Sequence, residues 1–167
     1  IAAAVGENVQ GTAEFFYICP AADISVFAEL PASPATLAES VTLSGSHTMV
    51  TSKIFYKVPV VALDKNNAAS EAPSSVLGSS PKQVFNAFIA GLTPQIQGFL
   101  KQANGEKHIV LIPLPDGQYL QMGTSLRGAQ VISNFDTTAA GGDGRGNTIV
   151  ISSDHTEQFY TGTITLA

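Results

Sequence analysis

The stretch Lys107-His-Ile-Val-Leu-Ile-Pro-Leu-Pro-Asp-Gly-Gln-Tyr-Leu-Gln-Met-Gly123 places two apolar runs around a turn sequence. Within the turn, Pro115 fixes its own φ, and Asp116-Gly117 supplies the positive φ that tight hairpin turns require. Residues 107–113 and 118–123 are therefore predicted to be the two strands of a β-hairpin.

Further strand-like segments, rich in aromatic and β-branched residues, lie on both sides of this hairpin. They cover residues 12–19, 24–30, 40–43 and 49–63 before it, and 129–133, 148–153 and 159–166 after it. In the last segment Thr161, Thr163 and Thr165 alternate with apolar residues, and such an uncharged face suits pairing with another sheet or lining a channel. The pattern predicts a mainly β (α+β) fold of two packed β-sheets, sandwich-like or barrel-like.

Residues 80–105 carry the clearest helix signal. Ser80 is suited to an N-cap and Pro81 to the first helical position. Apolar residues then follow at helical spacing: Val84, Phe85, Phe88, Ile89 and Leu92. Thr93 and Pro94 can begin a second helix that ends at Asn104-Gly105. We expect a kinked helix, or two short ones, packed on a sheet.

The length of 167 residues fits a single β-rich domain. Within it, residues 64–80 are small and polar, without helical or strand period. Loops of this length are uncommon unless they have a function. We interpret the segment either as a surface loop or as an arm that orders against a neighbouring subunit, with Asn66, Asn67, Val76 and Leu77 as candidate contact residues.

The composition favours association with other copies of the chain. Charged residues make up 13% of the sequence and hydrophobic residues 44%, against about 25% charged in a typical domain. A monomer with so few charges would expose apolar patches, which mark contact surfaces. The net charge of -5 and the scattered basic residues argue against nucleic-acid binding through phosphates. The apolar runs are too short for a membrane-spanning helix, so no membrane partner is expected.

Patterns typical of catalytic or metal sites are incomplete. Ser152, Asp154 and His155 are the residue types of a catalytic triad, but neighbouring strand side chains point to opposite faces. The glycine-rich residues 141–147 lack phosphate-loop spacing, and His47 and His108 have no metal-ligand neighbours in sequence. Cys19 lies in an apolar run and is interpreted as a core residue. We expect neither an enzyme nor a cofactor or metal.

Three stretches of the second half resemble the major tail tube proteins of tailed bacteriophages and prophages, notably those of Bacteroidetes hosts. The first is the predicted helix of residues 84–100 leading into His108-Ile-Val-Leu-Ile. The second is the hairpin Asp116-Gly117-Gln-Tyr119-Leu-Gln-Met-Gly123. The third is Gly142-Asp-Gly-Arg-Gly-Asn147-Thr-Ile-Val-Ile followed by Phe159-Tyr160. The resemblance covers roughly residues 45–167.

The resemblance implies a virion structural protein of the phage tail, assembled in the cytoplasm of a bacterial host. Its subunits would form hexameric rings, stacked into a conduit through which phage DNA passes without specific binding. A β-hairpin of each subunit would join a barrel around the lumen, and the 64–80 segment would contact the next ring. Partners would be other copies of the chain and other phage tail proteins.

The candidate interface residues come from three places. They are Asp116, Gly117 and Tyr119 of the hairpin, Thr161, Thr163 and Thr165 of the last strand, and Asn66, Asn67, Val76 and Leu77 of the arm. Two alternatives stay open. One is another virion component, such as a head–tail connector, a tail terminator or a capsid decoration protein. The other is a β-sandwich recognition module for glycan or protein.

Overall fold

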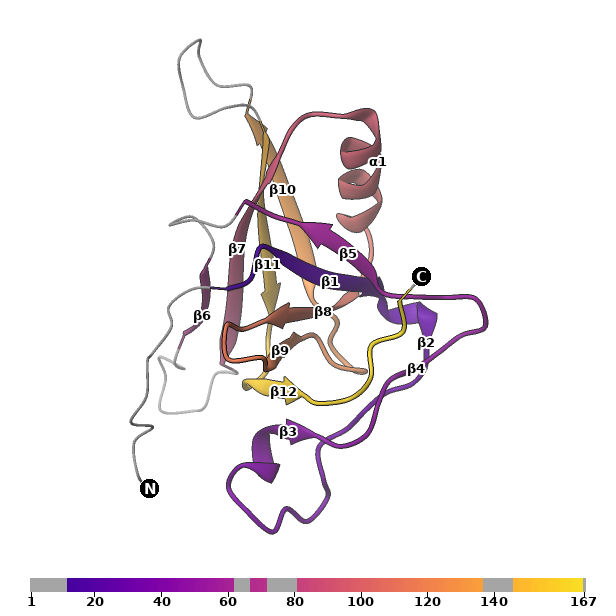
Figure 1. Ribbon diagram of the computed structural model, residues 1–167, viewed down its shortest axis with the longest axis vertical. Coiled ribbons are helices and arrows are strands. Elements are labelled where there is room, and N and C mark those ends of the chain that lie inside the picture. Colours follow the sequence, from indigo (N-terminus) through magenta and orange to yellow (C-terminus); the bar gives the residue numbers. More distant parts are fainter. Residues whose placement is uncertain (1–11, 62–66, 72–80, 137–145, 167) are drawn as a thin grey trace.

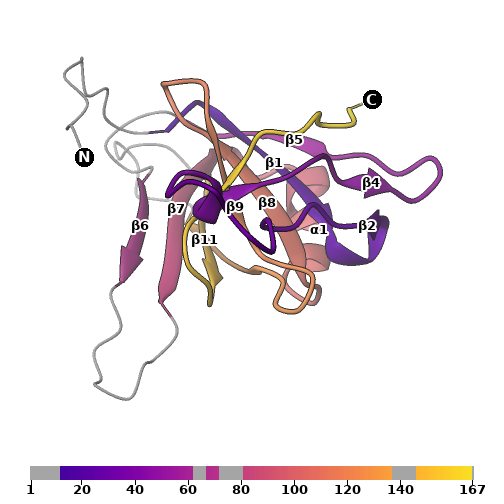
Figure 2. The ribbon, with the colours of Figure 1, turned by 90° about the horizontal axis from the view of Figure 1, so that it is seen from below.

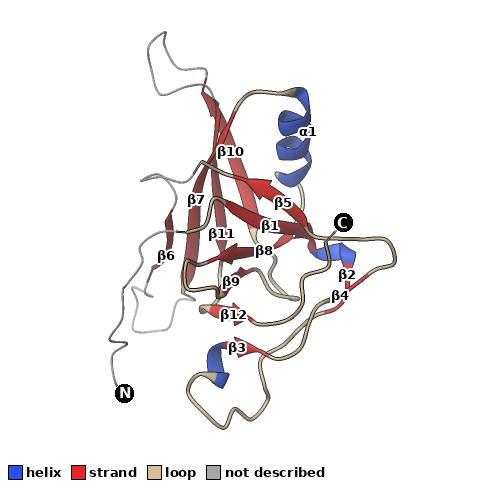
Figure 3. Cartoon of the chain, viewed as in Figure 1, coloured by secondary structure: helices blue, strands red, loops and turns tan. Residues whose placement is uncertain are grey.

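A computed structural model of the chain describes residues 12–61, 67–71, 81–136 and 146–166 (Figure 1). Its strands are β1 (Phe15–Pro20), β2 (Ile24–Val26), β3 (Thr42–Leu43), β4 (Thr48–Met49), β5 (Tyr56–Pro59), β6 (Asn67–Glu71), β7 (Lys82–Ala90), β8 (His108–Pro113), β9 (Tyr119–Met122), β10 (Gln130–Asp136), β11 (Gly146–Ser153) and β12 (Gln158–Tyr160). The helix α1 spans Pro94–Ala103, and short 3₁₀ turns occur at Ala21–Asp23 and Glu39–Val41. Strands dominate the cartoon in Figure 3, which confirms the predicted mainly β fold.

The described strands form two main sheets and a short ribbon. The large sheet has the order β3-β12-β9-β8-β1-β5, the small sheet β10-β11-β7-β6, and the ribbon pairs β2 with β4. The two main sheets pack face to face, as predicted, with apolar side chains of both filling the space between them. The helix α1 flanks this core beside the small sheet (Figure 1).

The hairpin predicted at residues 107–123 is present as β8 and β9. Val110 pairs with Met122, and Pro113 with Tyr119, in antiparallel register. In the turn, Gly117 has a φ of +85°, and the Asp116 Oδ1 accepts a hydrogen bond from the Gln118 N–H at 3.0 Å. The prediction of a positive φ is confirmed for Gly117, whereas Asp116 stabilises the turn through its side chain.

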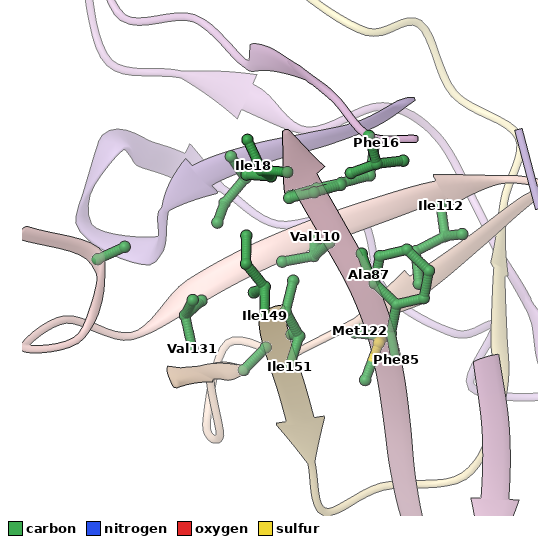
Figure 4. Packing of buried hydrophobic residues seen from close by; sticks show 14 of the residues in the cluster. Phe16, Ile18, Phe85, Ala87, Val110, Ile112, Met122, Val131, Ile149 and Ile151 are labelled. Carbon is green, nitrogen blue, oxygen red and sulfur yellow. The ribbon is translucent and has the colours of Figure 1, made fainter. Parts of the chain in front are cut away.

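The main core lies between the two sheets (Figure 4). Alternate residues of β7 and β11 point inward, among them Phe85 and Ile151, which are fully buried. The Phe16 ring of β1 meets the Phe85 ring edge to face at 5.7 Å. Because each fully buried side chain of this size contributes about 1.5–3 kcal/mol, this core holds the sheets together.

A second core covers the opposite face of the large sheet. Tyr17 and Cys19 of β1 and Leu111 of β8 pack there against Phe55 and Tyr160. Burial raises the pKa of the Cys19 thiol, so this cysteine is an inert core residue, as predicted. Residues 24–55, which we call the covering layer, and the C-terminal segment close this core.

Backbone hydrogen bonds join the two sheets at two places. Near β5, the Val61 N–H donates to the Phe88 carbonyl of β7 at 2.9 Å. Near β8, His108 and Ala129 exchange backbone hydrogen bonds of 3.0 and 2.7 Å. The sandwich is thus partly closed into a barrel.

The first half of the predicted helix is wrong, because residues 82–90 form the strand β7. The apolar residues Val84, Phe85, Phe88 and Ile89 fit a helical period, but Phe85 and Ile89 also fit an alternation of buried positions that runs through the strand. Pairing with β11 on one side and β6 on the other decides between the two periods. Ser80, the predicted cap, lies outside the described residues.

The second half of the helix prediction is confirmed. Thr93 is the N-cap of α1, where its Oγ1 accepts a hydrogen bond from the Ile96 N–H at 3.3 Å, and Pro94 is the first helical residue. Leu100 packs into the main core. Asn147 of β11, buried beside the helix, accepts a hydrogen bond from the Gln97 Nε2 at 2.9 Å.

Several predicted strands are shorter than expected. The segment 49–63 is broken by a turn in which the Lys53 N–H donates to the Val50 carbonyl and Ser52 has a positive φ. In segment 24–30 only Ile24–Val26 is a strand, and in segment 159–166 the strand ends at Tyr160. The expectation that residues 64–80 lack strand structure is wrong for Asn67–Glu71, which pair with β7.

The end of β9 generates a stability prediction. Gly123 has a φ of +92°, and a Cβ on it would lie 2.5 Å from the His108 carbonyl oxygen. Gly123→Ala should therefore lower the free energy of unfolding by more than about 2 kcal/mol, measured by urea denaturation. Gly117→Ala is the matched control, because Gly117 has a similar φ but a Cβ on it would meet nothing within 4 Å. It should cost only about 1 kcal/mol, and equal losses would contradict the steric argument.

The N-cap of α1 generates a second stability prediction. Thr93→Ala removes the acceptor of the Ile96 N–H and should lower the free energy of unfolding by about 1 kcal/mol. Thr93→Ser keeps the hydroxyl and should retain most of this free energy of unfolding. If the two variants lose the same stability in thermal unfolding followed by circular dichroism, the capping hydrogen bond is not what Thr93 contributes.

Candidate assembly surface

The edge strand β10 is open on the side away from β11 among the described strands. Its sequence, Gln-Val-Ile-Ser-Asn-Phe-Asp, contains no lysine, arginine or proline. Ile132 and Phe135 are 49% and 68% exposed. Natural edge strands are usually short, charged or interrupted by proline, because an unpaired edge offers a template for another strand. The edge of β10 lacks the lysine and proline protections, although Ala129 just before it bonds to His108 and α1 packs against the strand.

The edges of the large sheet differ from the edge formed by β10. The edge strand β5 contains Pro59, and the Lys57 ammonium lies 3.9 Å from the centre of the Phe15 ring. At the other edge, β3 has only the residues Thr42–Leu43. Short length, lysine and proline all disfavour strand addition. Open pairing capacity is therefore concentrated on the small sheet.

The second edge of the small sheet is β6. Figure 2 shows it at the side of the molecule opposite the β2–β4 ribbon. Asn67 is exposed and pairs with Asn86 of β7, whose Nδ2 donates a hydrogen bond to the Asn67 Oδ1 at 3.3 Å. The prediction placed Asn67 in a contact surface, and the structure places it on an edge strand.

The outer face of the small sheet is uncharged in its central rows. Because Phe85, Ile149 and Val131 point into the core, their strand neighbours point outward. The outward residues are Gln130, Ile132, Asn134, Thr148, Val150, Ser152, Val84, Asn86, Phe88, Asn67 and Ala69. Charged residues stand only at strand ends: Lys82 begins β7, Glu71 ends β6 and Asp136 ends β10.

A glycine lets this face pack tightly at one end. A Cβ on Gly146 would lie 2.3 Å from the Phe88 Cζ and 2.5 Å from the Ile89 carbonyl oxygen. The Phe88 ring thus covers Gly146 of the neighbouring strand, which compensates for the missing side chain. This contact belongs to the face and helps to fix the β7–β11 register.

The predicted hairpin residues meet one of the predicted threonines at a hollow. Gly117, Tyr119 and Thr161 line a cavity of about 490 Å³ together with residues around Val41 and Phe159. Asp116 is in the turn itself, where its carboxylate accepts the Gln118 N–H. Tyr119 is half-buried beside the Tyr17 ring, 6.2 Å between centres.

The predicted threonine strand is wrong beyond Tyr160, although its three threonines are exposed. The Thr161 hydroxyl donates to the Leu43 carbonyl, and the Thr163 N–H donates to the Ser46 Oγ. The Thr165 carbonyl accepts from the Phe55 N–H. The segment is therefore held against the covering layer and has no ladder partner among the described strands, because its hydrogen bonds go to β3 and to two separate loops.

Three predicted contact residues, Asn66, Val76 and Leu77, lie outside the described residues. The three residue types of a triad do not converge on a reacting group: both ring nitrogens of His155 contact backbone groups, the Gly123 N–H at 2.8 Å and the Thr156 carbonyl at 2.6 Å. Among the described residues, no group of three or more His, Cys, Asp or Glu could hold a metal ion.

Within the described ranges, no helix is long and apolar enough to span a membrane. Comparison of the chain with protein-family models, with curated proteins and with solved structures returns no match.

Proposed function

We propose that the chain is a self-assembling structural subunit, and specifically a tail tube subunit of a tailed phage. The observation that carries the proposal is the edge of β10, which has no strand partner along Gln130–Asp136, contains no lysine or proline, and has Ile132 and Phe135 exposed beside it. An edge of this kind is stabilised when a second strand satisfies its backbone groups and covers its apolar side chains. In this proposal the second strand belongs to another copy.

The partner strand is β6 of the neighbouring copy. The small sheet has β10 at one edge and β6 at the other, so a β10–β6 contact joins two different surfaces of the same chain. Such a head-to-tail contact produces a ring when the rotation between copies closes. A closed ring would leave no free edge on the small sheet, which is how barrels avoid uncontrolled pairing.

The face that lines such a ring is the uncharged outer face of the small sheet, because the inner face is filled by the main core. A lumen without basic residues in its central rows would not retain DNA through phosphate contacts. The net charge of -5 acts in the same direction. The likeness of the hairpin Asp116–Gly123 and of the last two strands to major tail tube proteins supports the same function, whereas the helix that the likeness placed at residues 84–90 is the strand β7.

A β-sandwich recognition module for glycan or protein is the second candidate. The hollow of about 490 Å³ that Gly117, Tyr119 and Thr161 line favours it, because ligand sites are concave with a few polar groups at their walls. This function predicts a monomer with a ligand, whereas the tube predicts assembly in the absence of any ligand.

Negative-stain electron microscopy across a protein concentration series distinguishes the two. Rings or tubes of uniform diameter are expected from the tube subunit. Monomers throughout the series would contradict self-assembly and leave recognition as the function to test by glycan and peptide arrays.

The variant Ile132→Lys tests the edge itself. A lysine on β10 should weaken strand addition, because its charge would be held against an apolar contact. The concentration needed for half-maximal assembly should rise at least about tenfold, which corresponds to about 1.4 kcal/mol.

Leu126→Lys is the matched control, since Leu126 is also an exposed aliphatic residue, at 87%, but lies in a turn outside the small sheet. It should assemble as the unsubstituted chain does. If both variants assemble normally, with unchanged thermal unfolding, the β10 edge is not the interface.

A further inference from the structure

Two histidines contact the end of β9 from different elements. His47 precedes β4 in the covering layer and is only 4% exposed. His155 lies in the connection between β11 and β12, where the chain passes from the small sheet to the large one. Both side chains reach the segment Gln121–Gly123.

Hydrogen bonds fix the tautomer of His47. Its Nδ1 lies 3.0 Å from the Ala28 N–H, so this nitrogen is the acceptor and carries no proton. The proton is therefore on Nε2, which donates to the Gln121 Oε1 at 2.8 Å. The His47 ring stacks on the Tyr160 ring, with centres 4.8 Å apart. The backbone N–H of His47 donates to the Tyr160 hydroxyl at 3.1 Å.

His155 has the opposite tautomer. The Gly123 N–H donates to its Nε2 at 2.8 Å, and its Nδ1 then carries the proton and donates to the Thr156 carbonyl at 2.6 Å. Gln121 connects the two histidines, because its Nε2 donates to the Gly123 carbonyl at 3.0 Å. One continuous set of hydrogen bonds thus runs from Ala28 to Thr156.

A second proton on either ring is incompatible with this arrangement. It would replace the acceptor of a backbone N–H by a donor and leave two N–H groups facing each other. Burial lowers the pKa of both histidines. The hydrogen bond to Gln121 partly offsets this decrease at His47. At His155 the Thr156 carbonyl, Glu157 and Asp154 partly offset it. Of the described groups packed on the rings, the ionisable ones are Tyr160 at His47, and Asp154 and Glu157 beside His155.

We propose that His47 and His155 form a proton-sensitive clamp on the end of β9, closed when both rings are neutral and opened when they are charged. His47 joins the covering layer to β9 and β12. His155 joins the connection between the sheets to β9, and the Gln83 Nε2 of β7 donates to its carbonyl at 3.1 Å. Opening the clamp frees the covering layer from the large sheet in acid. The device belongs to the single subunit and does not depend on assembly.

The direction of the pH effect follows from linkage. The folded-state pKa of each histidine lies below its ordinary value of 6.5, so below pH 6.5 the unfolded chain binds protons that the folded chain does not. The stability that the clamp contributes is complete above pH 6.5 and is lost as the pH falls through the folded-state values.

Nitrogen-detected NMR of the whole chain between about pH 7.5 and 5, the range in which histidine titrates, tests the clamp. The proton is expected on Nε2 of His47 and on Nδ1 of His155 at neutral pH. Hydrogen-exchange protection of the Ala28 and Gly123 amides, corrected for intrinsic exchange, should fall about tenfold or more over this range. The reverse tautomers, or protection that stays constant while the rings become charged, would overturn the proposal.

Uncharged mimics provide the variants. His47→Asn places an acceptor near Nδ1, and His155→Gln places one near Nε2, so each keeps the backbone N–H partner without a proton to gain. Each should flatten the pH dependence at its own amide. His108→Gln is the control, because burial lowers the pKa of His108 too but its ring shares none of the clamp's hydrogen bonds. If His108→Gln flattens the pH dependence of exchange protection at Ala28 and Gly123, the clamp assignment is wrong. If a variant fails to fold, the titration of the unsubstituted chain tests the clamp.

Discussion

The burial of β8 on both of its faces is the constraint on which the rest of the structure depends. All six residues of His108–Pro113 are buried. Val110 and Ile112 point into the core between the sheets, whereas Ile109 and Leu111 point into the core under the covering layer. A strand of this kind is stable only when something apolar covers each face, because one exposed face would return about half of its side chains to water.

The two covers are built differently, and this difference separates their roles. The small sheet covers one face with long, paired strands, so it is regular but ends in two edges. Residues 24–55 cover the other face with loops and a short ribbon, and they have few ladder hydrogen bonds to hold them. Side-chain hydrogen bonds from His47 and Tyr160 replace the missing ladder. Open strand edges are therefore concentrated on the small sheet, whereas the covering layer depends on side-chain hydrogen bonds, including that of the proton-sensitive His47.

Local chemistry made part of the fold predictable from sequence. The Asp116-Gly117 turn and the Thr93-Pro94 cap depend on neighbouring residues alone, and both are found where expected. The strand β7 was predicted as a helix because its apolar residues fit both periods, and only its neighbours β11 and β6 select the extended form. The open edge of β10 could not be predicted, since strand order determines which strand is at an edge. The His47–Gln121–His155 contacts join residues that are distant in sequence, and no spacing predicts them.

The structure shows where part of the low charge content of the chain is found. A charge fraction of 13% could reflect a larger buried core or a surface left apolar for contact. The central rows of the small sheet's outer face contain no charged residue, yet Ile132 and Thr148 on that face are exposed. A solvent-facing sheet normally alternates buried apolar with exposed polar residues, many of them charged. Here the outward positions are filled by uncharged polar residues together with aliphatic ones and Phe88 instead. The low charge content of the chain is thus partly explained by one uncharged surface, the outer face of the small sheet. This surface lies between the two edge strands β10 and β6, the arrangement that strand addition between copies requires.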